Sequence, residues 1–593
     1  MATESTGEDG ARPSRRAVMK GLAVGAGMTM AGVPLEVLGA SRVDAAPGAP
    51  AVDWWSPLIT FRTPDGRYAA PIHASLMPSG DVVLMGGARP TPDPDENMVF
   101  SRYAFTMRPH ALNAALPAEL VGTAWPEPMD VTNKVVERWL ITDDLFCAGH
   151  SLTADGRHLT VGGIQSWKNL DTDEYVFIGL PYATVFDGTT WRRVAKDMVG
   201  KPINGKARRW YPTVTRLPGG RMLVTSGNDE IYPVHRVNLT IELFDPATEA
   251  WTLVSGPRST PLEIWHHDYT HAIVLPKQVG VFSVLMFGEM GIPVLGTIST
   301  PMLWDVRTGR PRPGTEDFQA ARLAAANSWT SEEAPNSGAT TVPLPIRVKD
   351  GEWGYANGSV LISGGPEESE LSQQVDVYDP VADAWHAPIA TGVYRHDGAS
   401  VVLPDGRILL VGGMGPEPDA LHAGYVDPAA GFTYTAGTTA TEEMRAYHGV
   451  AILLADGRVL TAGGRGADME PWSEAPDMRY LYPPYLFRPR PVITTAPTQV
   501  RLNQTFTIKT TGPKPAEVVL MGLGSFTHCF DQNQRYVQLR TTAVAAAAGS
   551  TTAFTTTVVA PPSSTVAPLG HYLAFVLDAA RTPSVAKVVQ VIA

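Results

Sequence analysis

The sequence predicts an all-β protein, a seven-bladed β-propeller followed by a β-sandwich. One segment recurs seven times along the chain, and this recurrence stops near Ile493. Such an internal repeat indicates a β-propeller or another repeat architecture, because a single unit cannot bury its apolar face without its neighbours. The copies begin at Ile72, Cys147, Tyr211, Tyr269, Gly338, His396 and Tyr447.

Each copy has the pattern of a β-hairpin. HDGASVVLPDGRILLVGG, from His396, shows a strand, a turn, a second apolar strand and a Gly-Gly stop. β-Branched residues around an Asp-Gly turn are a strong hairpin signal. An aromatic residue, an Asp and then a Trp follow most copies, as in Phe244, Asp245 and Trp251. Four strands per copy predict a seven-bladed propeller of the kelch type over residues 47–488.

The chain changes character after the seventh copy. Residues 489–593 are rich in Thr, Val and Ala and lack the Gly-Gly stops. A strand-rich segment of this length predicts an immunoglobulin-like β-sandwich. Helix is scarce, and Glu316–Ala326 is the clearest helical candidate.

The N-terminus has the layout of an export signal. Arg15 and Arg16 precede the apolar run Leu22–Ala40, and small residues follow. This order is typical of a twin-arginine signal peptide, which we expect over residues 1–46, with a secreted or cell-envelope protein as the result. The run is short and glycine-rich, so we expect no stable membrane span. The net charge of -12 makes a nucleic-acid partner improbable.

Five side chains, four at the start of copies and one in the C-terminal segment, point to a redox metal. Tyr447 and His448 begin the seventh copy, while Cys147 and Tyr211 begin two others. A propeller gathers the starts of its blades around one axis, so these residues meet. Phenolate and imidazole suit Cu(II), and His528 is the second imidazole, on a strand-like stretch. Because adjacent strand residues face opposite ways, Tyr447 and His448 meet the axis together only from a loop or bulge.

The segments FCAGH, RRWYPT, RAYHG and FTHCFDQNQR follow in this order along the chain. Together they resemble the copper radical oxidases, the family of galactose oxidase and glyoxal oxidase. The resemblance implies that Cys147 is joined by a thioether to Tyr211, the equatorial tyrosine that bears the radical. It also makes Tyr447 the axial tyrosine, and His448 and His528 the equatorial ligands. YPPYLFRPRPVI and the other departures from galactose oxidase favour the bacterial glyoxal-oxidase-like branch.

The resemblance implies an activity and two cofactors. The activity is oxidation of a primary alcohol or hydrated aldehyde, with O2 reduced to H2O2. The cofactors are one copper ion and the Cys-Tyr radical, and Tyr447 accepts the substrate hydroxyl proton. A tryptophan should stack on the cross-link. Asn228 and Asp229 stand where galactose oxidase has its tryptophan, so Trp329 is our candidate and Trp265 the second choice.

Several alternatives stay open on the residues alone. Cys147 and Cys529 are the two cysteines of the chain, and two cysteines in an exported protein commonly form a disulfide. An extracellular kelch propeller could bind glycans without catalysis. A hydrolase or lyase would need carboxylates such as Asp397 or Glu443 on the axis. The substrate, whether a small alcohol, an aldehyde or a glycan, is left open, as are the oligomeric state and a copper chaperone as a partner. Further histidines near the starts of copies are pocket candidates, namely His150, His266 and His396.

Overall fold

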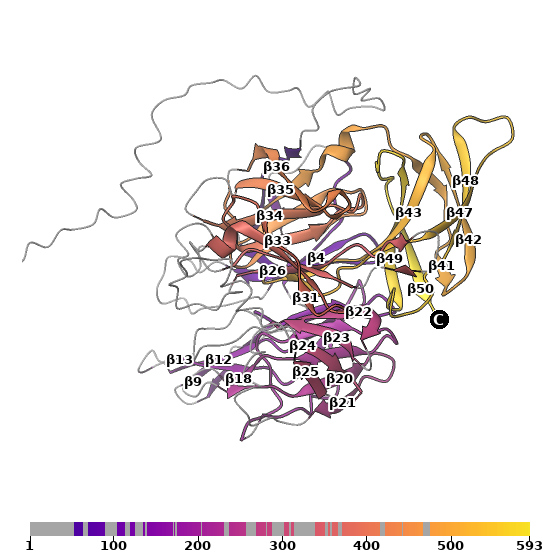
Figure 1. Cartoon of the computed structure of the whole chain (residues 1–593). Helices are drawn as coiled ribbons and strands as arrows, with labels where there is room; N and C mark the ends of the chain where they lie inside the picture. Colours follow the sequence, from indigo (N-terminus) through magenta and orange to yellow (C-terminus); the bar gives the residue numbers. More distant parts are fainter. Residues whose placement is uncertain are drawn as a thin grey trace, which may run out of the picture. The chain divides into compact units, whose positions relative to one another are not determined.

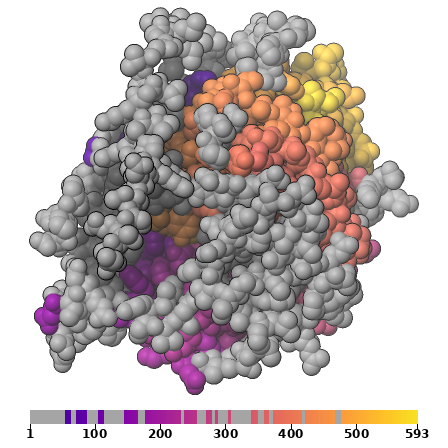
Figure 2. All heavy atoms as spheres, turned by 60° about the vertical axis from the view of Figure 1, so that its left-hand side comes forward, coloured from indigo at the N-terminus to yellow at the C-terminus, as the bar shows by residue number. Residues whose placement is uncertain are grey.

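The computed structural model describes residues 53–62, 69–88, 103–112, 119–121, 123–124, 134–136, 139–169, 171, 175–202, 204–230, 236–255, 269–279, 282–287, 302–307, 310–313, 338–349, 354–355, 358–365, 370–415, 421–441, 443–465 and 475–593. These residues are coloured by sequence in Figures 1 and 2. Their regular elements are β-strands and short 3-10 helices, which confirms the all-β class. The predicted signal segment 1–46 and helix Glu316–Ala326 lie outside the described residues.

Seven sheets share one plan, an antiparallel path of four strands. In chain order their strands are β3 (Ala69–Leu76), β4 (Val82–Ala88), β5 (Tyr103–Met107) and β7 (Thr123–Ala124); β10 (Gly149–Leu152), β11 (His158–Val161), β14 (Ala183–Phe186) and β15 (Trp191–Arg193); β16 (Thr213–Arg216), β17 (Met222–Thr225), β20 (Ile241–Asp245) and β21 (Ala250–Ser255); β22 (His271–Val279), β23 (Phe282–Phe287), β24 (Met302–Asp305) and β25 (Arg310–Pro313); β26 (Thr340–Pro343), β29 (Val360–Ser363), β30 (Gln374–Asp379) and β31 (Ala384–Trp385); β33 (His396–Val402), β34 (Ile408–Met414), β35 (His422–Asp427) and β36 (Thr433–Ala440); and β37 (Gly449–Leu453), β38 (Val459–Gly463), β39 (Asp477–Tyr482) and β2 (Ile59–Arg62).

The first two strands of these sheets form because a glycine turn joins two apolar runs. Gly156 and Gly406 adopt φ of 89° and 82° in the turns that precede β11 and β34. Glycine reaches this left-handed region without steric cost, which sets the hairpin register. Every residue of β10, β11, β16 and β33 is buried, as in strands covered on both faces.

Neighbouring sheets touch through their first strands. β10 contacts β16, β16 contacts β22, β26 contacts β33, β33 contacts β37, and β37 contacts β3. The seventh sheet joins strands from both ends of the described repeats, since β2 pairs antiparallel with β39 through Ile59 and Met478. This pairing ties the N-terminal strand to the last copy and restrains both.

An additional sheet forms next to the second copy. Part of the chain between Cys147 and Tyr211 forms the hairpin β12 (Ile164–Asn169) and β13 (Tyr175–Gly179), inserted between β11 and β14. This hairpin pairs with β9 (Trp139–Asp144) and β18 (Asn228–Glu230). The sheet is completed by β8 (Lys134–Val136) and β19 (Arg236–Val237).

Shorter elements complete the first 488 residues. They are β1 (Trp54–Trp55), which pairs with β39, β6 (Glu119–Val121), which lies parallel to β2, the hairpin β27 (Val348–Lys349) and β28 (Gly354–Tyr355), β32 (Ile389–Ala390) and the 3-10 helices η3 (Glu370–Gln373), η5 (Pro428–Ala430) and η6 (Pro484–Phe487).

Residues after 490 build two sheets around a separate core, drawn orange to yellow in Figure 1. One sheet orders β40 (Val492–Thr495), β42 (Thr505–Thr511), β48 (Ala553–Val559) and β47 (Arg540–Ala546). The other orders β41 (Gln499–Arg501), β50 (Lys587–Ile592), β49 (Gly570–Asp578), β43 (Pro515–Gly522) and β46 (Tyr536–Gln538). Buried residues alternate with exposed ones along β42 and with half-buried ones along β48, so each strand presents one face to this core.

One hairpin of the C-terminal segment leaves this pair of sheets. β44 (Ser525–Thr527) and β45 (Phe530–Asp531) pair with each other, and β44 also pairs antiparallel with β3. The hairpin contacts β3, β10, β26, β33 and β37, all first strands of their sheets. It therefore brings its turn to the place where the starts of the copies meet.

No helix in the described part of the chain has the length and apolar character needed to span a membrane.

Candidate metal centre

The residues that lead into the first strands share an unusual backbone conformation. Cys147, Tyr211 and His448 have φ of 54°, 64° and 69°. Tyr269, at 40°, repeats the feature before β22. A positive φ is uncommon for residues other than glycine and is retained where the surroundings fix it. We call these four the leading residues; their turn redirects each side chain just before a strand begins.

Backbone hydrogen bonds connect the leading residues of consecutive sheets. The amide of Tyr211 donates to the carbonyl of Cys147 at 3.0 Å, and that of Tyr269 donates to Tyr211 at 2.9 Å. Asp397, with φ of 56°, donates in the same way to Gly338 at 2.8 Å. Cys147 and Tyr211 are 64 residues apart in the numbering. Their side chains nevertheless extend from backbone positions that are directly hydrogen-bonded to each other.

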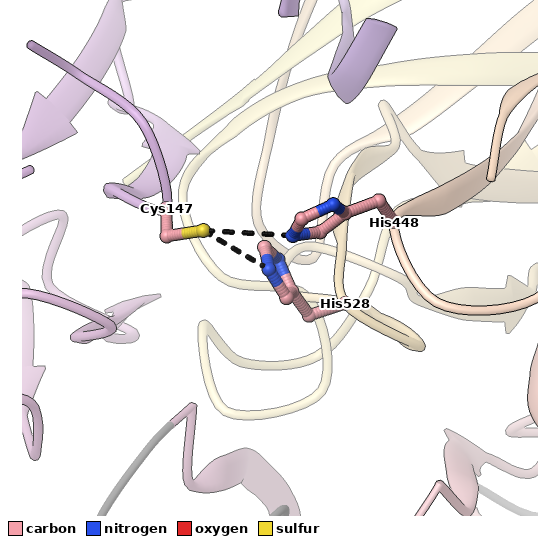
Figure 3. Close-up of side chains that lie close together, drawn as sticks. All are labelled: Cys147, His448 and His528. Carbon is pink, nitrogen blue, oxygen red and sulfur yellow. Dashed lines mark hydrogen bonds between the residues drawn. The ribbon is translucent and has the colours of Figure 1, made fainter. Parts of the chain in front are cut away.

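Cys147, His448 and His528 form a compact buried cluster (Figure 3). The Cys147 sulfur lies 3.7 Å from Nε2 of His448 and 3.3 Å from Nε2 of His528. In Figure 3 both imidazoles direct Nε2 toward the sulfur. The three candidate ligand atoms lie within 4.8 Å of one another, a spacing that a single ion can bridge.

The two tyrosines adjoin the same cluster. The hydroxyls of Tyr211 and Tyr447 are 3.3 Å apart. The Tyr211 and Tyr447 rings lie edge-on to the His528 ring, with centroids at 5.6 and 5.3 Å. Tyr447 and His448 occupy the turn immediately before β37, with ring centroids 4.0 Å apart. All five residues singled out as cofactor or ligand candidates from the sequence therefore lie together.

The expectation that His528 lies on a strand is wrong in detail. His528 and Cys529 are the two turn residues between β44 and β45, with φ of 45° and 64°. A two-residue hairpin turn favours positive φ at both positions, so neither side chain follows strand alternation. Cys529 donates from its sulfur to Asp397 at 3.5 Å, while Cys147 faces the imidazoles. Neither cysteine forms a disulfide.

Burial controls the protonation of the cluster. Burial raises the pKa of Tyr211 and of Tyr447 well above the usual range, and it lowers the pKa of His528 well below. The phenols and the imidazole are thus neutral in the protein alone. A neutral imidazole is the form that binds metal, and a cation beside a phenol would favour the phenolate.

The donor set fits a copper ion. Two imidazole nitrogens and two phenol oxygens form a nitrogen and oxygen set that suits Cu(II). The Oγ1 of Thr527 lies 2.6 Å from Nδ1 of His528, which orients the ring so that Nε2 is directed toward the cluster. A two-histidine, one-cysteine set is a second possibility, typical of copper sites that only transfer electrons.

Trp210 supplies the aromatic contact to Tyr211. Their ring centroids are 4.6 Å apart with an interplanar angle of 31°. Asn228 exchanges backbone hydrogen bonds with Trp210 at 2.8 and 2.6 Å, so it supports this tryptophan from the neighbouring strand. The sequence candidates Trp329 and Trp265 lie outside the described residues. Direct adjacency in RRWYPT was the signal that sequence reasoning overlooked.

Three further residues surround the cluster without having been predicted. Tyr269 stacks on His528 at 4.3 Å between centroids and donates its hydroxyl to the carbonyl of Ala148 at 3.0 Å. The guanidinium of Arg465 lies 4.9 Å from the centroid of the Tyr447 ring. The ring of His73, on β3, lies 6.0 Å from that of His528. Only Tyr269 carried a sequence signal, as the first residue of a copy.

The remaining pocket candidates have structural partners. Nδ1 of His150 lies 2.7 Å from Oγ of Ser525, and Nδ1 of His396 lies 3.0 Å from the Gly365 carbonyl. His266 lies outside the described residues.

The two carboxylates considered for hydrolysis are also engaged. Glu443 forms an ion pair with Arg479 at 2.6 Å. Asp397 accepts from Cys529 and lies 3.2 Å from Nε2 of His396. Burial alone would raise the pKa of Asp397, but His396 and the Cys529 thiol lower it. Both carboxylates are therefore already paired with neighbouring side chains.

Comparison with known proteins gives a consistent picture. Residues 490–591 match the galactose oxidase-like, early set domain. Aldehyde oxidase GLOX1 of Arabidopsis thaliana is 22% identical over 78% of this chain and 74% of its own length. Galactose oxidase of Gibberella zeae is 24% identical over 76% of this chain and 61% of its own length.

A solved structure has the same fold. A fungal alcohol oxidase of the AA5 family, in complex with copper, superimposes with a TM-score of 0.62 and 19% identity. The match covers 91% of this chain and 100% of that one. The chain spans less than two thirds of the galactose oxidase it matches. It is thus similar over most of its length to copper and aldehyde oxidases of the galactose oxidase and glyoxal oxidase type.

Proposed function

We propose that the protein is a copper radical oxidase that converts a primary alcohol or a hydrated aldehyde with reduction of O2 to H2O2. The observation that carries the proposal is the meeting of buried Cys147, His448 and His528 with the half-buried Tyr211 and Tyr447 in one cluster. These residues come from three separate sheets and from the C-terminal hairpin. A binding protein has no use for this set of redox-active and metal-binding side chains in its interior.

The proposal includes the domain plan. The seven four-stranded sheets are the blades of a kelch propeller within residues 47–488, and residues 489–593 form an immunoglobulin-like domain. Contacts between first strands, and the pairing of β2 with β39 that closes the set, support this reading. Residues 1–46 are a twin-arginine signal, so the protein folds before export to the cell envelope or beyond. The branch is the bacterial glyoxal-oxidase-like one.

The cross-link forms between a thiol and an aromatic ring. The Cys147 sulfur bonds to a ring carbon of Tyr211, and one S–H and one C–H bond break. Two electrons and two protons leave, and O2 accepts them as H2O2. The backbone hydrogen bond of 3.0 Å between Tyr211 and Cys147 holds the two residues together for this reaction.

The chain would hold copper through Tyr211, Tyr447, His448 and His528. Copper supplies one of the two electron changes that the oxidation of an alcohol requires. The cross-linked Tyr211 supplies the other, because a thioether substituent makes a phenol easier to oxidise. Trp210 covers one side of that ring at 4.6 Å and shields it from solvent.

Two side chains move hydrogen. Tyr447 accepts the proton of the substrate hydroxyl as general base, and Arg465, over its ring at 4.9 Å, favours the anionic form. The oxidised Tyr211 removes the hydrogen bound to the substrate carbon. The 3.3 Å separation of their hydroxyls supports two roles at neighbouring points of one bound substrate. Activity assays must decide among three substrate classes, namely a small alcohol, an aldehyde and a glycan terminus.

The test is the mass of the mature protein before and after loading with copper in air. The proposal requires loss of two hydrogen atoms, located by peptide mapping to a Cys147 peptide joined to a Tyr211 peptide. The Cys147→Ser variant is the control and should keep its mass and its fold. Copper bound beside an unmodified Cys147 thiolate would instead assign an electron-transfer site. A chain without affinity for copper would leave the glycan-binding alternative.

A further inference from the structure

A small cavity lies on the other side of the hairpin that carries His528. Its volume is about 40 Å³, and its wall joins β16 and β22 to residues Phe530–Arg535. A water molecule needs about 10–15 Å³ of such space, so there is room for a halide ion or for two or three waters. The cavity belongs to no part of the proposed copper site.

Two residues that line this cavity, Arg216 and Gln532, carry buried donors without a hydrogen-bond partner among the described residues. Nε and Nη1 of Arg216 are buried and have no hydrogen-bond partner among the described residues, and the same is true of Nε2 of Gln532. The other end of the Gln532 amide is fixed, because its Oε1 accepts from the Val214 amide at 2.8 Å. This bond sets the orientation of the amide, so its NH2 group is the free end. A buried donor left unpaired costs free energy, because it has given up its hydrogen bonds to water.

The charge of the cavity wall is also unbalanced. Arg216 and Arg535 are both buried, and neither forms an ion pair within the described part of the chain. Arg535 donates instead to the carbonyls of Val566 at 2.9 Å and Val274 at 2.6 Å. Burial, together with the charge of Arg216, lowers the pKa of Arg535 to about 10, so both guanidinium groups stay charged at neutral pH.

One carboxylate lines the cavity, that of Asp531, and it already accepts two backbone hydrogen bonds. Oδ1 of Asp531 accepts from the amides of Ser525 at 2.8 Å and Asn533 at 3.0 Å. His571, on β49 near Arg216, has its pKa lowered by burial and by the Arg216 charge, so it is neutral. Arg216 and Arg535 bring two positive charges to the lining of the cavity and Asp531 brings one negative charge, so the net charge of the lining is positive. Buried charges in proteins are normally paired or bound to an ion.

We propose that this cavity binds a small monovalent anion of the halide class, held by Arg216 and the Gln532 amide. The anion neutralises Arg216 and satisfies donors that water would satisfy less well, because charge-assisted hydrogen bonds are about twice as strong as neutral ones. The carbonyl and amide contacts of residues 532–535 fix the chain that follows directly after His528. The anion therefore stabilises the hairpin that presents His528.

Bromide is the probe, because its anomalous scattering identifies it in crystals. Crystals grown with bromide should show an anomalous peak in the cavity beside Arg216. In solution, the melting temperature should rise with the logarithm of bromide concentration above the dissociation constant. Gluconate, which is too large to enter, keeps the ionic strength constant.

Gln532→Glu gives the sharpest comparison. Its carboxylate keeps an oxygen for the Val214 amide and supplies a permanent negative charge to Arg216. We expect the bromide peak and the bromide dependence to vanish, while the melting temperature in gluconate equals or exceeds that of the wild type. Arg216→Met should lose the peak as well, and the exposed Arg501→Met is a control that should keep it.

Water density in place of an anomalous peak, with a melting temperature that ignores bromide, would overturn the proposal. A Gln532→Glu variant that still responds to bromide would do the same. Both measurements use folding and diffraction only, so they succeed or fail independently of the oxidase activity.

Discussion

Replacing Arg209 should destabilise the protein more than any other single change near the site. Arg209 is the arginine two residues before Tyr211, and its side chain is 0% exposed. It donates to the Glu242 carboxylate at 2.9 and 3.2 Å. It also donates to the carbonyls of Ser226 at 2.6 Å, Asn238 at 3.1 Å and Thr240 at 2.9 Å.

The magnitude follows from what Arg209→Met leaves behind. Glu242, 0% exposed, keeps only the amides of Val199 and Gly200 at 2.7 Å each. An ionised carboxylate without its counter-charge, together with the unpaired carbonyls, costs about 3–5 kcal/mol. Replacing both ionic groups, as in Arg209→Met with Glu242→Leu, removes the lone charge. The double variant should therefore recover part of the lost stability.

Urea denaturation followed by tryptophan fluorescence measures the free energy of unfolding of the wild type, both single variants and the double variant. A double variant as unstable as the sum of the single ones would show that the two groups do not interact. A loss below about 1 kcal/mol in Arg209→Met would refute the reasoning, because that is the range of exposed pairs. The exposed pair Arg193–Asp197, at 2.7 Å, is the control and should change stability by less than this.

Three further predictions concern the site and the core. Tyr447→Phe should keep the cross-link mass but lower kcat by about 10²–10⁴, the usual contribution of a general base, as steady-state H2O2 assays will show; unchanged kcat would remove the base role. Trp210→Leu should also keep the cross-link, yet shorten the lifetime of the oxidised Tyr211 in absorption and electron paramagnetic resonance measurements; an equal lifetime would assign the shielding elsewhere. Burial lowers the pKa of His158 and of His271 to about 3, against about 6.5 in the unfolded chain. The stability that each neutral histidine contributes above pH 6.5 is therefore lost as the pH falls toward 3, by up to about 1.4 kcal/mol per pH unit for each histidine. Acid unfolding of the His271→Gln variant should therefore begin at a lower pH than that of the wild type.

The strands were predictable because their signals are local. An apolar run, a glycine turn and a second apolar run determine a hairpin, and seven copies of that pattern in the sequence correspond to seven four-stranded sheets. The hairpin β12–β13, which lies between β11 and β14, does not belong to the four-stranded plan of the copies. Its pairing with β9 and β18 depends on contacts that no local pattern contains.

The members of the site could be predicted from the sequence, and so could the turn that carries Tyr447 and His448 just before β37. Residues at equivalent positions of repeated units meet wherever the units surround one axis, so Cys147, Tyr211 and Tyr447 could be grouped in advance. The turn that holds His528 could not, because FTHCF alternates like a strand and contains no glycine. Trp210 was missed for a related reason. The positive φ of Tyr211 brings two consecutive rings together, whereas strand geometry would separate them.

Hydrogen bonds between the main chains of the leading residues fix where their side chains begin, independently of which side chains they are. Main-chain atoms make those bonds, so Cys147, Tyr211 and Tyr269 can each change without losing them. The backbone thus fixes these three positions whatever side chains they carry. A single substitution there changes the chemical group at a fixed location. Tyr269 is the position where this freedom is largest, since its ring already touches His528 while the proposed reaction assigns it no role. Exchanging it for histidine would offer a third imidazole to the same ion, and so a route to redesign the metal's reactivity without rebuilding the fold.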